Sequence, residues 1–258
     1  MKIVMPNLML ACFSFMVVSL MFTNIGNAEF DPKTVVGMWL FDEGKGNTAA
    51  DASENGNDGK LENNPKWIKN GKFGAALEFD GNESKGHVVV GNLGLSGEVT
   101  LILWAKPSDV ADDDRLISNL SGPTNPAFAI RFQSGAVDIW GRAWKPVIPK
   151  FDENKWGHYA FVLDSEGNAT GYYNGKEGDT VTDTYIFTDI GIGATFLHQW
   201  GQYYSGVFDE VAFFSVALTE NDIQTLMTRG LKSALTVYPA GKLTTTWGNI
   251  KVNQQGAN

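Results

Sequence analysis

Residues 158–175 read HYAFVLDSEGNATGYYNG, and this stretch indicates the fold more clearly than any other part of the chain. Its two apolar and aromatic runs, His158–Leu163 and Thr170–Tyr173, predict β-strands because branched and aromatic side chains suit a half-buried pleated surface. Asn174-Gly175 follows, and this pair accepts the positive φ angles of a tight two-residue turn. The stretch therefore predicts antiparallel strands joined by tight turns.

The same pattern continues on both sides of this stretch. Short apolar or alternating runs lie between clusters of Gly, Asn and Asp. These runs predict further strands at Val35–Phe41, His87–Val90, Val99–Lys106, Phe128–Phe132, Ala136–Trp140 and Val207–Phe214. Many short strands with frequent turns predict an all-β fold, a two-sheet antiparallel β-sandwich of the jelly-roll type.

One short helix is predicted near the C-terminal end of this pattern. Thr219 suits an N-cap, and Asp222 three residues later forms a weak capping box. Gly230 stands where a helix usually ends in glycine. Between them an apolar stripe occupies one face, made of Ile223, Leu226 and Met227.

The first 28 residues are typical of a secretory signal peptide. Lys2 precedes an apolar run from Leu8 to Ile25, and the small residues Gly26–Ala28 suit signal-peptidase cleavage. The alternative is an uncleaved membrane anchor, since the run approaches the length that spans a bilayer. Residues 29–235 are then predicted as one jelly-roll domain, and residues 236–258 as a tail that adds a strand or an ordered arm.

Cysteine content and charge restrict the function. Cys12 is the only cysteine, so a cleaved chain has none and must be held by its core or by a metal. The chain has 20 basic and 29 acidic residues, and losing Lys2 leaves 19 − 29 = −10. This charge argues against nucleic acid and anionic membrane surfaces as partners. We expect a secreted protein, extracellular or periplasmic.

Six segments occur in the order found in one known family. They are Trp39–Gly44, Asp51–Gly59, Ala76–Gly81, Trp104–Pro107, Trp156–Gly175 and Gly206–Ile223. The set resembles the laminin-G-like domains of the concanavalin A-like lectin/glucanase family. The resemblance implies a jelly roll that binds glycans or proteins outside cells, often with a structural calcium ion. Some members of this fold are enzymes, so the fold alone does not decide function.

Calcium binds six to eight oxygen atoms, mainly from carboxylates, carbonyls and water. Asp42 and Glu43 end the first strand, Asp80 lies in a Phe-Asp-Gly turn, and Asp209 lies in an apolar final strand. The resemblance implies that the first and last strands are neighbours. We therefore predict a structural calcium site from Asp42, Glu43, Asp80 and Asp209. The alternative is that Asp80 only forms a turn and Asp209 only faces outward.

A second calcium pattern is misleading. Residues 51–62 match the spacing of an EF-hand loop, including Gly56 and Glu62. An EF-hand needs flanking helices, whereas Gly-rich sequence precedes this segment and Asn63-Asn64-Pro65 follows it. We expect a loop shaped by its Asn and Asp side chains, which form such turns unaided.

Two clusters combine aromatic rings with planar polar groups, as saccharide sites do. The first comprises Trp140, Arg142 and Trp144. The second comprises His198, Gln199, Trp200, Gln202, Tyr203 and Tyr204. The alternative is that these rings fill the core, as large aromatics usually do. Core positions are expected for three other rings, Trp39, Trp104 and Trp156.

No catalytic pattern accompanies these clusters. The E-x-D-x-x-E spacing of hydrolases with this fold occurs only across the Phe-Asp-Gly turn, at Glu78–Glu83, and not within one uninterrupted strand. A Gly-x-Ser-x-Gly elbow does not occur. We therefore predict a non-catalytic binding module for a polysaccharide or glycan. The alternatives are a protein-interaction or structural module of a cell-surface or envelope assembly, and a carbohydrate-active enzyme without a recognised motif.

Overall fold

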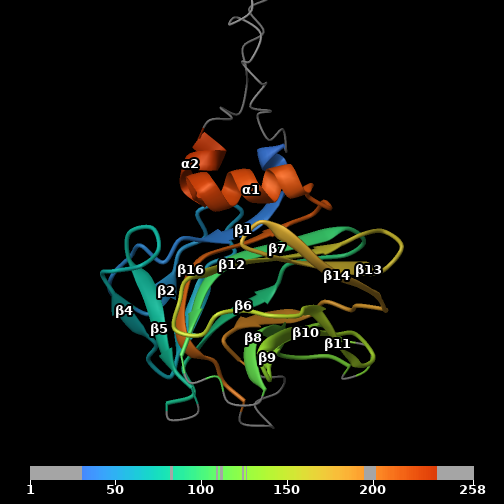
Figure 1. Ribbon diagram of the computed structural model, residues 1–258. Helices are drawn as coiled ribbons and strands as arrows, with labels where there is room; N and C mark the ends of the chain where they lie inside the picture. The colour runs from blue at the N-terminus through green and yellow to red at the C-terminus, as the bar shows by residue number, and fades with distance from the viewer. Residues whose placement is uncertain are drawn as a thin grey trace, which may run out of the picture.

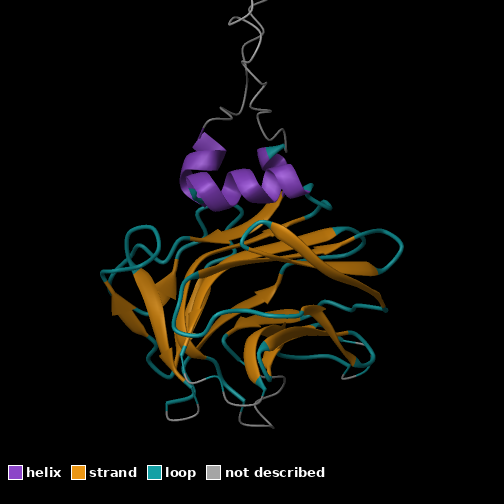
Figure 2. Cartoon of the chain, in the orientation of Figure 1, coloured by secondary structure: helices purple, strands orange, loops and turns teal. Residues whose placement is uncertain are grey.

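The chain forms a β-sandwich. A computed structural model describes residues 31–81, 84–108, 110, 113–123, 125, 127–194 and 202–236. Two eight-stranded antiparallel sheets pack face to face, and two short helices cover the outer face of one of them (Figures 1 and 2). This confirms the predicted all-β sandwich. No helix within the described residues is long and apolar enough to cross a membrane.

The first sheet has the strand order β14-β13-β12-β7-β16-β5-β4, with β1 also paired to β16. In chain order its strands are β1 (Val35–Trp39), β4 (Lys66–Ile68), β5 (Ala76–Asp80), β7 (Val99–Pro107), β12 (Gly157–Leu163), β13 (Asn168–Tyr173), β14 (Lys176–Thr182) and β16 (Ser205–Phe214).

The second sheet has the order β11-β10-β9-β8-β15-β6-β3-β2. In chain order its strands are β2 (Thr48–Ala49), β3 (Gly59–Glu62), β6 (His87–Asn92), β8 (Asp114–Asn119), β9 (Ala129–Gln133), β10 (Ala136–Trp140), β11 (Trp144–Ile148) and β15 (Asp189–Ile192). Successive side chains of a strand point to opposite faces, so one face of this sheet lines the core and the other meets solvent.

The main core lies between the sheets and is rich in aromatic rings. Phe132 packs against Phe151 and Tyr159, with ring centroids 4.4 and 5.5 Å apart. Trp39 and Trp104 are buried as predicted. The prediction for Trp156 is wrong, because this residue precedes β12 and is half-buried.

Two helices follow the last strand. The predicted one is α1 (Glu220–Arg229), whose capping box between Thr219 and Asp222 is complete. A second helix, α2 (Leu231–Thr236), was not predicted, and a 3₁₀ helix, η2 (Pro32–Thr34), precedes β1. A second apolar cluster joins the helices to the outer face of the first sheet, including Ile102, Ala160, Ala212, Ile223, Leu226 and Leu231. The predicted signal peptide and residues 237–258 lie outside the described residues.

Strand β11 lies against β13 and β14 of the other sheet, and glycines allow this close approach. A Cβ atom on either Gly171 or Gly178 would lie 2.5 Å from the Val147 carbonyl oxygen. Neither glycine has a left-handed backbone, so space alone requires glycine at both positions. These contacts fix β11, and with it the hairpin between β10 and β11.

We expect Gly171→Ala to lower the free energy of unfolding by about 1–3 kcal/mol, because β11 must move away from β13. Urea unfolding measures this loss. The neighbouring Thr170→Ala is the control, since it removes only a half-exposed hydroxyl that contacts Thr180. Equal losses in the two variants would contradict the close-packing explanation.

Candidate functional site

The outer face of β8, β9 and β10 carries a row of charged residues. Strand pairing places Arg131 opposite both Arg115 and Asp138. Beside this row, Trp140 and Trp144 stand opposite each other in the β10–β11 hairpin, with ring centroids 5.2 Å apart. We call this surface the arginine–tryptophan face, defined by Asp113, Arg115, Arg131, Asp138, Trp140 and Trp144.

The charges on this face neutralise one another. Arg131 forms ion pairs with Asp138 and Asp113 at 3.0 and 3.1 Å. Arg115 also pairs with Asp113 and donates a 2.7 Å hydrogen bond to Gln202 Oε1. Burial and the neighbouring Arg131 lower the pKa of Arg115 to about 10, against the opposing effect of Asp113. Arg115 therefore remains charged at neutral pH, and two carboxylates pair with the two arginines.

The two guanidinium groups also hold the Trp144 ring. The Cζ atoms of Arg131 and Arg115 lie 4.0 and 4.5 Å from its centroid. Cation–π contacts of this kind contribute roughly 0.5–2 kcal/mol each. Trp140 and Trp144 are both half-buried, so each keeps part of its ring at the surface. The result is a pair of adjacent indoles, one of them fixed in position by the protein.

The other predicted ligand-binding residues divide into three groups. Arg142 is exposed in the β10–β11 turn, beside the two tryptophans. Tyr203 and Tyr204 are buried: Tyr204 stacks on Phe208 at 3.9 Å, and Tyr203 packs near His87. Their prediction as surface ligands is wrong, because both rings fill the interior. His198 and Trp200 lie outside the described residues.

Sequence reasoning missed the charged half of this face. The signal was present, because Arg131 stands between Ile130 and Phe132, and Asp138 between two apolar residues. A period of two places such residues on the outer face of a strand. The sequence pattern does not show that β8, β9 and β10 pair with one another. This pairing brings the charged residues of separate strands together.

The four predicted calcium ligands do not gather at one point. Asp42 and Asp209 share a loop: they accept hydrogen bonds from the backbone N–H groups of Ala75 and Phe73 at 3.0 and 2.8 Å. The Asp80 side chain contacts Ser84, and the β5–β16 register places Asp80 opposite Ser205, four residues before Asp209. Glu43 accepts a hydrogen bond from the backbone N–H of Ala50 at 2.6 Å.

These contacts do not assemble the predicted set. No group of three or more His, Cys, Asp or Glu side chains in the described part of the chain could hold a metal ion. The residues therefore do not fit one calcium site, and calcium binding stays a prediction without a location.

The EF-hand-like segment is a loop tied down by its own polar side chains. It follows β2 and ends in β3, which forms its last four residues, and no helix flanks it. Asp51 accepts backbone hydrogen bonds from Met38 and Asn57, each at 2.9 Å. The side-chain amide of Asn57 in turn donates to the Val36 carbonyl. The carboxylate of Asp51 thus organises the loop through protein donors, as predicted for Asx-rich turns.

Strand β16 buries two consecutive carboxyl groups at a bulge. Glu210 has a φ of 46°, and the pairing with β7 shifts between Asp209 and Ala212. Asp209 is 0% exposed, and Glu210 accepts a 2.9 Å hydrogen bond from the Leu231 N–H at the start of α2. Burial raises the pKa of each carboxyl group to about 7, although backbone hydrogen bonds oppose the shift.

Comparison with known proteins supports the family resemblance. The family model for the concanavalin A-like lectin/glucanases superfamily matches residues 80–224, which is 145 of 258 residues and more than half of the chain. The chain belongs to this superfamily. The match spans the arginine–tryptophan face and β16. A search of curated proteins finds no match.

Solved structures share the superfamily fold at low identity. One is domain 4 of AbnA, a GH43 extracellular arabinanase from Geobacillus stearothermophilus, solved in complex with arabinotriose. It is 20% identical to this chain, with a TM-score of 0.59. The alignment covers 75% of this chain and 98% of that domain. The binding domain of botulinum neurotoxin DC, in complex with rat synaptotagmin II, is 17% identical with a TM-score of 0.59, covering 76% and 52%. This chain thus spans about half of that toxin domain.

The buried carboxyl group of Asp209 generates a pH prediction. Its folded-state pKa of about 7 exceeds the ordinary 3.8, so the folded protein holds a proton that the unfolded chain has released. The stability from this group is complete below about pH 4 and is lost as the pH rises through about 7. Asp209→Asn cannot ionise, so between about pH 5 and about pH 8 its free energy of unfolding should fall less than that of the wild type, by on the order of 2 kcal/mol.

Urea unfolding at several pH values measures this difference. Asp179→Asn is the control, because Asp179 is exposed on β14. Parallel stability curves for the wild type and Asp209→Asn would show that Asp209 ionises normally in the folded state.

Proposed function

We propose that this chain is a non-catalytic module that binds a polysaccharide on its arginine–tryptophan face. The observation that carries the proposal is the pair of half-buried indoles, Trp140 and Trp144, 5.2 Å apart on the outer face of the second sheet. An indole combines an apolar ring face with a polar N–H group at its edge. A sugar ring likewise has C–H groups on its faces and hydroxyl groups around its edge. Two neighbouring rings suit consecutive sugar units.

The network beneath the indoles favours binding because it forms without a ligand. Arg115 and Arg131 hold the Trp144 ring, and Asp113 and Asp138 hold the two arginines. A side chain that is ordered before binding loses little conformational entropy when the ligand arrives. Strands β8 to β11 carry all of these groups except Asp113, which directly precedes β8, and strands are more rigid than loops.

The charge balance of this face favours a neutral glycan. Its two arginines and two aspartates sum to zero, and Arg142 at the turn supplies exposed hydrogen-bond donors. The complex of AbnA domain 4 with arabinotriose is a precedent for a neutral oligosaccharide bound by a domain of this fold.

Two further observations support a binding role outside the cell. Asp113 and Asp138 are each paired with arginine, an arrangement that does not suit the proton-donating carboxyl group that a glycosidase needs. Residues 1–28 have the charge, apolar run and small-residue end of a signal peptide, which favours export.

We expect Trp140→Ala and Trp144→Ala each to weaken polysaccharide binding at least about fivefold, since aromatic stacking contacts contribute about 1 kcal/mol or more per ring. A glycan array identifies the ligand, and titration calorimetry measures the affinity. Trp67→Ala is the matched control, because Trp67 is a half-buried tryptophan on β4 of the first sheet.

Thermal unfolding of each variant shows whether the fold persists. Polysaccharide binding that survives both β10–β11 substitutions in folded protein would place the site elsewhere. An absence of binding to any glycan would overturn the proposed function.

A further inference from the structure

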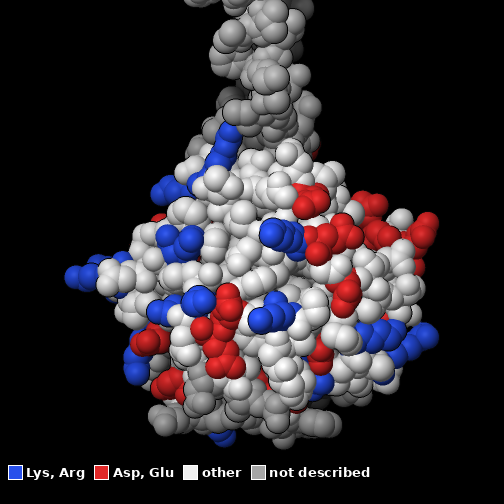
Figure 3. All heavy atoms as spheres, viewed as in Figure 1, with Lys and Arg blue, Asp and Glu red and all other residues white. Residues whose placement is uncertain are grey.

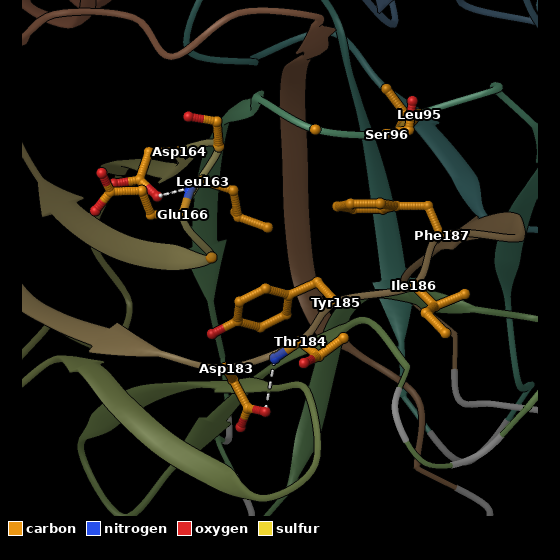
Figure 4. A pocket seen from close by; sticks show the side chains of 13 residues that line it. Leu95, Ser96, Leu163, Asp164, Glu166, Asp183, Thr184, Tyr185, Ile186 and Phe187 are labelled. Atoms are coloured by element: carbon orange, nitrogen blue, oxygen red, sulfur yellow. Dashed lines mark hydrogen bonds between the residues drawn. The ribbon is translucent and has the colours of Figure 1, made fainter.

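A separate cleft lies at one end of the sandwich, where the chain crosses from the first sheet to the second. Residues 183–188 make this crossing between β14 and β15. The loop before β7 and the β12–β13 turn form the other walls, and the cleft has a volume of about 470 Å³ (Figure 4). Clefts of this size accommodate small organic ligands or a few peptide residues.

The floor of the cleft is apolar. Leu95 and Leu163 are buried there, and the Phe187 ring packs on Phe128 of the core at 4.6 Å. Figure 4 shows the Phe187 and Tyr185 rings lying between the two walls. Ile186 also lines the cleft and, among the described residues, is the only large apolar side chain classed as exposed, at 37%. A ligand that fits this floor must have an apolar part.

The rim of the cleft is acidic. Asp164, Glu166 and Asp183 line it, whereas none of its 13 described lining residues is Lys, Arg or His. The Lys145 ammonium group lies 3.0 Å from Asp183 and offsets one of the three charges. In Figure 3 acidic side chains gather on the side of the molecule where β13 and β14 lie.

One of the rim carboxylates, that of Asp164, is held in place by local hydrogen bonds, and Glu166 lies beside it. The Asp164 oxygens accept from the Glu166 N–H and from the backbone and side chain of Asn168, at 2.8–2.9 Å. The Asn168 bonds lower the pKa of Asp164, so it is ionised at neutral pH. Glu166 is exposed at the tip of the same turn, and no described residue binds its carboxylate.

One cleft-lining residue carries a polar atom that is shielded from the cleft. The hydroxyl group of Tyr185 is buried and makes no hydrogen bond to the described residues. Burial, together with the Asp183 charge, raises the pKa of this phenol, so it stays neutral. A ligand in the cleft therefore meets the Tyr185 ring and not its oxygen.

We propose that this end cleft binds an organic cation, a primary ammonium or guanidinium group on an apolar stem. The apolar floor receives the stem, and Glu166 and Asp164 attract the cation. Such a group occurs in free amines and in the Lys or Arg side chains of a protein partner. The two sources share this chemistry and differ in what surrounds the stem.

The cleft is distinct from the arginine–tryptophan face, although the two share a wall. A Cβ atom on Gly141, in the β10–β11 turn, would lie 2.7 Å from the Asp183 side chain. Lys145, next to Trp144, donates both to Asp183 and to the Thr182 carbonyl. The arginine–tryptophan face carries two indoles and charges that are paired with one another, whereas the end cleft carries carboxylates that are only partly paired. Either proposal can therefore fail without the other.

The test measures the binding of small cationic probes to residues 29–258 of the chain. Ligand-observed NMR and calorimetry at low salt are the two measurements. The probes are 4-phenylbutylamine with its neutral analogue 4-phenylbutanol, and the peptide acetyl-Leu-Lys-Leu-amide with its norleucine counterpart. We expect each cation to bind more tightly than its neutral analogue. Added salt should weaken the binding of the cations and leave the binding of the neutral analogues unchanged.

One variant tests the assigned carboxylate, and three are controls. Glu166→Gln should weaken cation binding about two- to fivefold, as for an exposed ion pair. Tyr185→Phe should leave cation binding unchanged, because the Tyr185 hydroxyl is shielded from the cleft. Glu153→Gln is the matched control, because Glu153 is an exposed carboxylate in another loop, and it should have no effect. Trp140→Ala should also leave cation binding unchanged.

Each outcome decides the proposal. Binding of the amine alone, or of the peptide alone, supports the site and identifies the source of the cation, provided that Glu166→Gln weakens it. Equal binding of the neutral analogues, equal effects of Glu166→Gln and Glu153→Gln, or no binding of either cation would overturn it. Loss of glycan binding in Trp140→Ala with intact amine binding separates the two sites.

Discussion

Burial on both faces of the first sheet is the constraint on which the rest of this structure depends. Its inner face packs on the second sheet, and α1 and α2 cover part of its outer face, so β16 is buried at every position after Ser205. Polar groups on such a strand must find partners inside the protein. Asp209 Oδ2 and Glu210 do so by holding the 71–75 loop and the start of α2, whereas Asp209 Oδ1 has no hydrogen-bond partner among the described residues. Ligands are therefore left with the outer face of the second sheet and the ends of the sandwich.

The two candidate sites use these remaining surfaces in different ways. On the second sheet, paired charges beneath two indoles produce a rigid surface with little net charge. At the end of the sandwich, three carboxylates surround an apolar floor, and one lysine offsets only part of their charge. The contact of Gly141 with Asp183 separates the two environments. The β10–β11 hairpin thus carries the two indoles of the first site, and Gly141 in its turn packs against Asp183 of the second site.

Residues of the same type have different roles in this protein because their side chains are buried to different extents. Tyr204 and Trp140 both occur in aromatic-polar clusters of the sequence, but Tyr204 stacks in the core and Trp140 lies at the surface. Likewise, Asp51 and Asp209 are both buried in part and bound by backbone N–H groups, but only in Asp209 does burial outweigh the hydrogen bonds and raise the pKa. For Asp51 hydrogen bonds from Ser53, Met38 and Asn57 exceed the effect of burial, and its pKa is lowered.

The sequence by itself determined the fold class, most strands, helix α1 and the proximity of Trp140 to Trp144, because all of these follow from local periodicity, capping and turn chemistry. It did not determine which side chains meet across strands. The pairing of Arg131 with Asp113 and Asp138, the end cleft around Tyr185, and the separation of Asp80 from Asp209 arise only from register and strand order. Register depends on contacts between segments far apart in the chain, and no local pattern encodes those contacts. The tertiary structure therefore decided where the charges are neutralised and where they are left for a ligand.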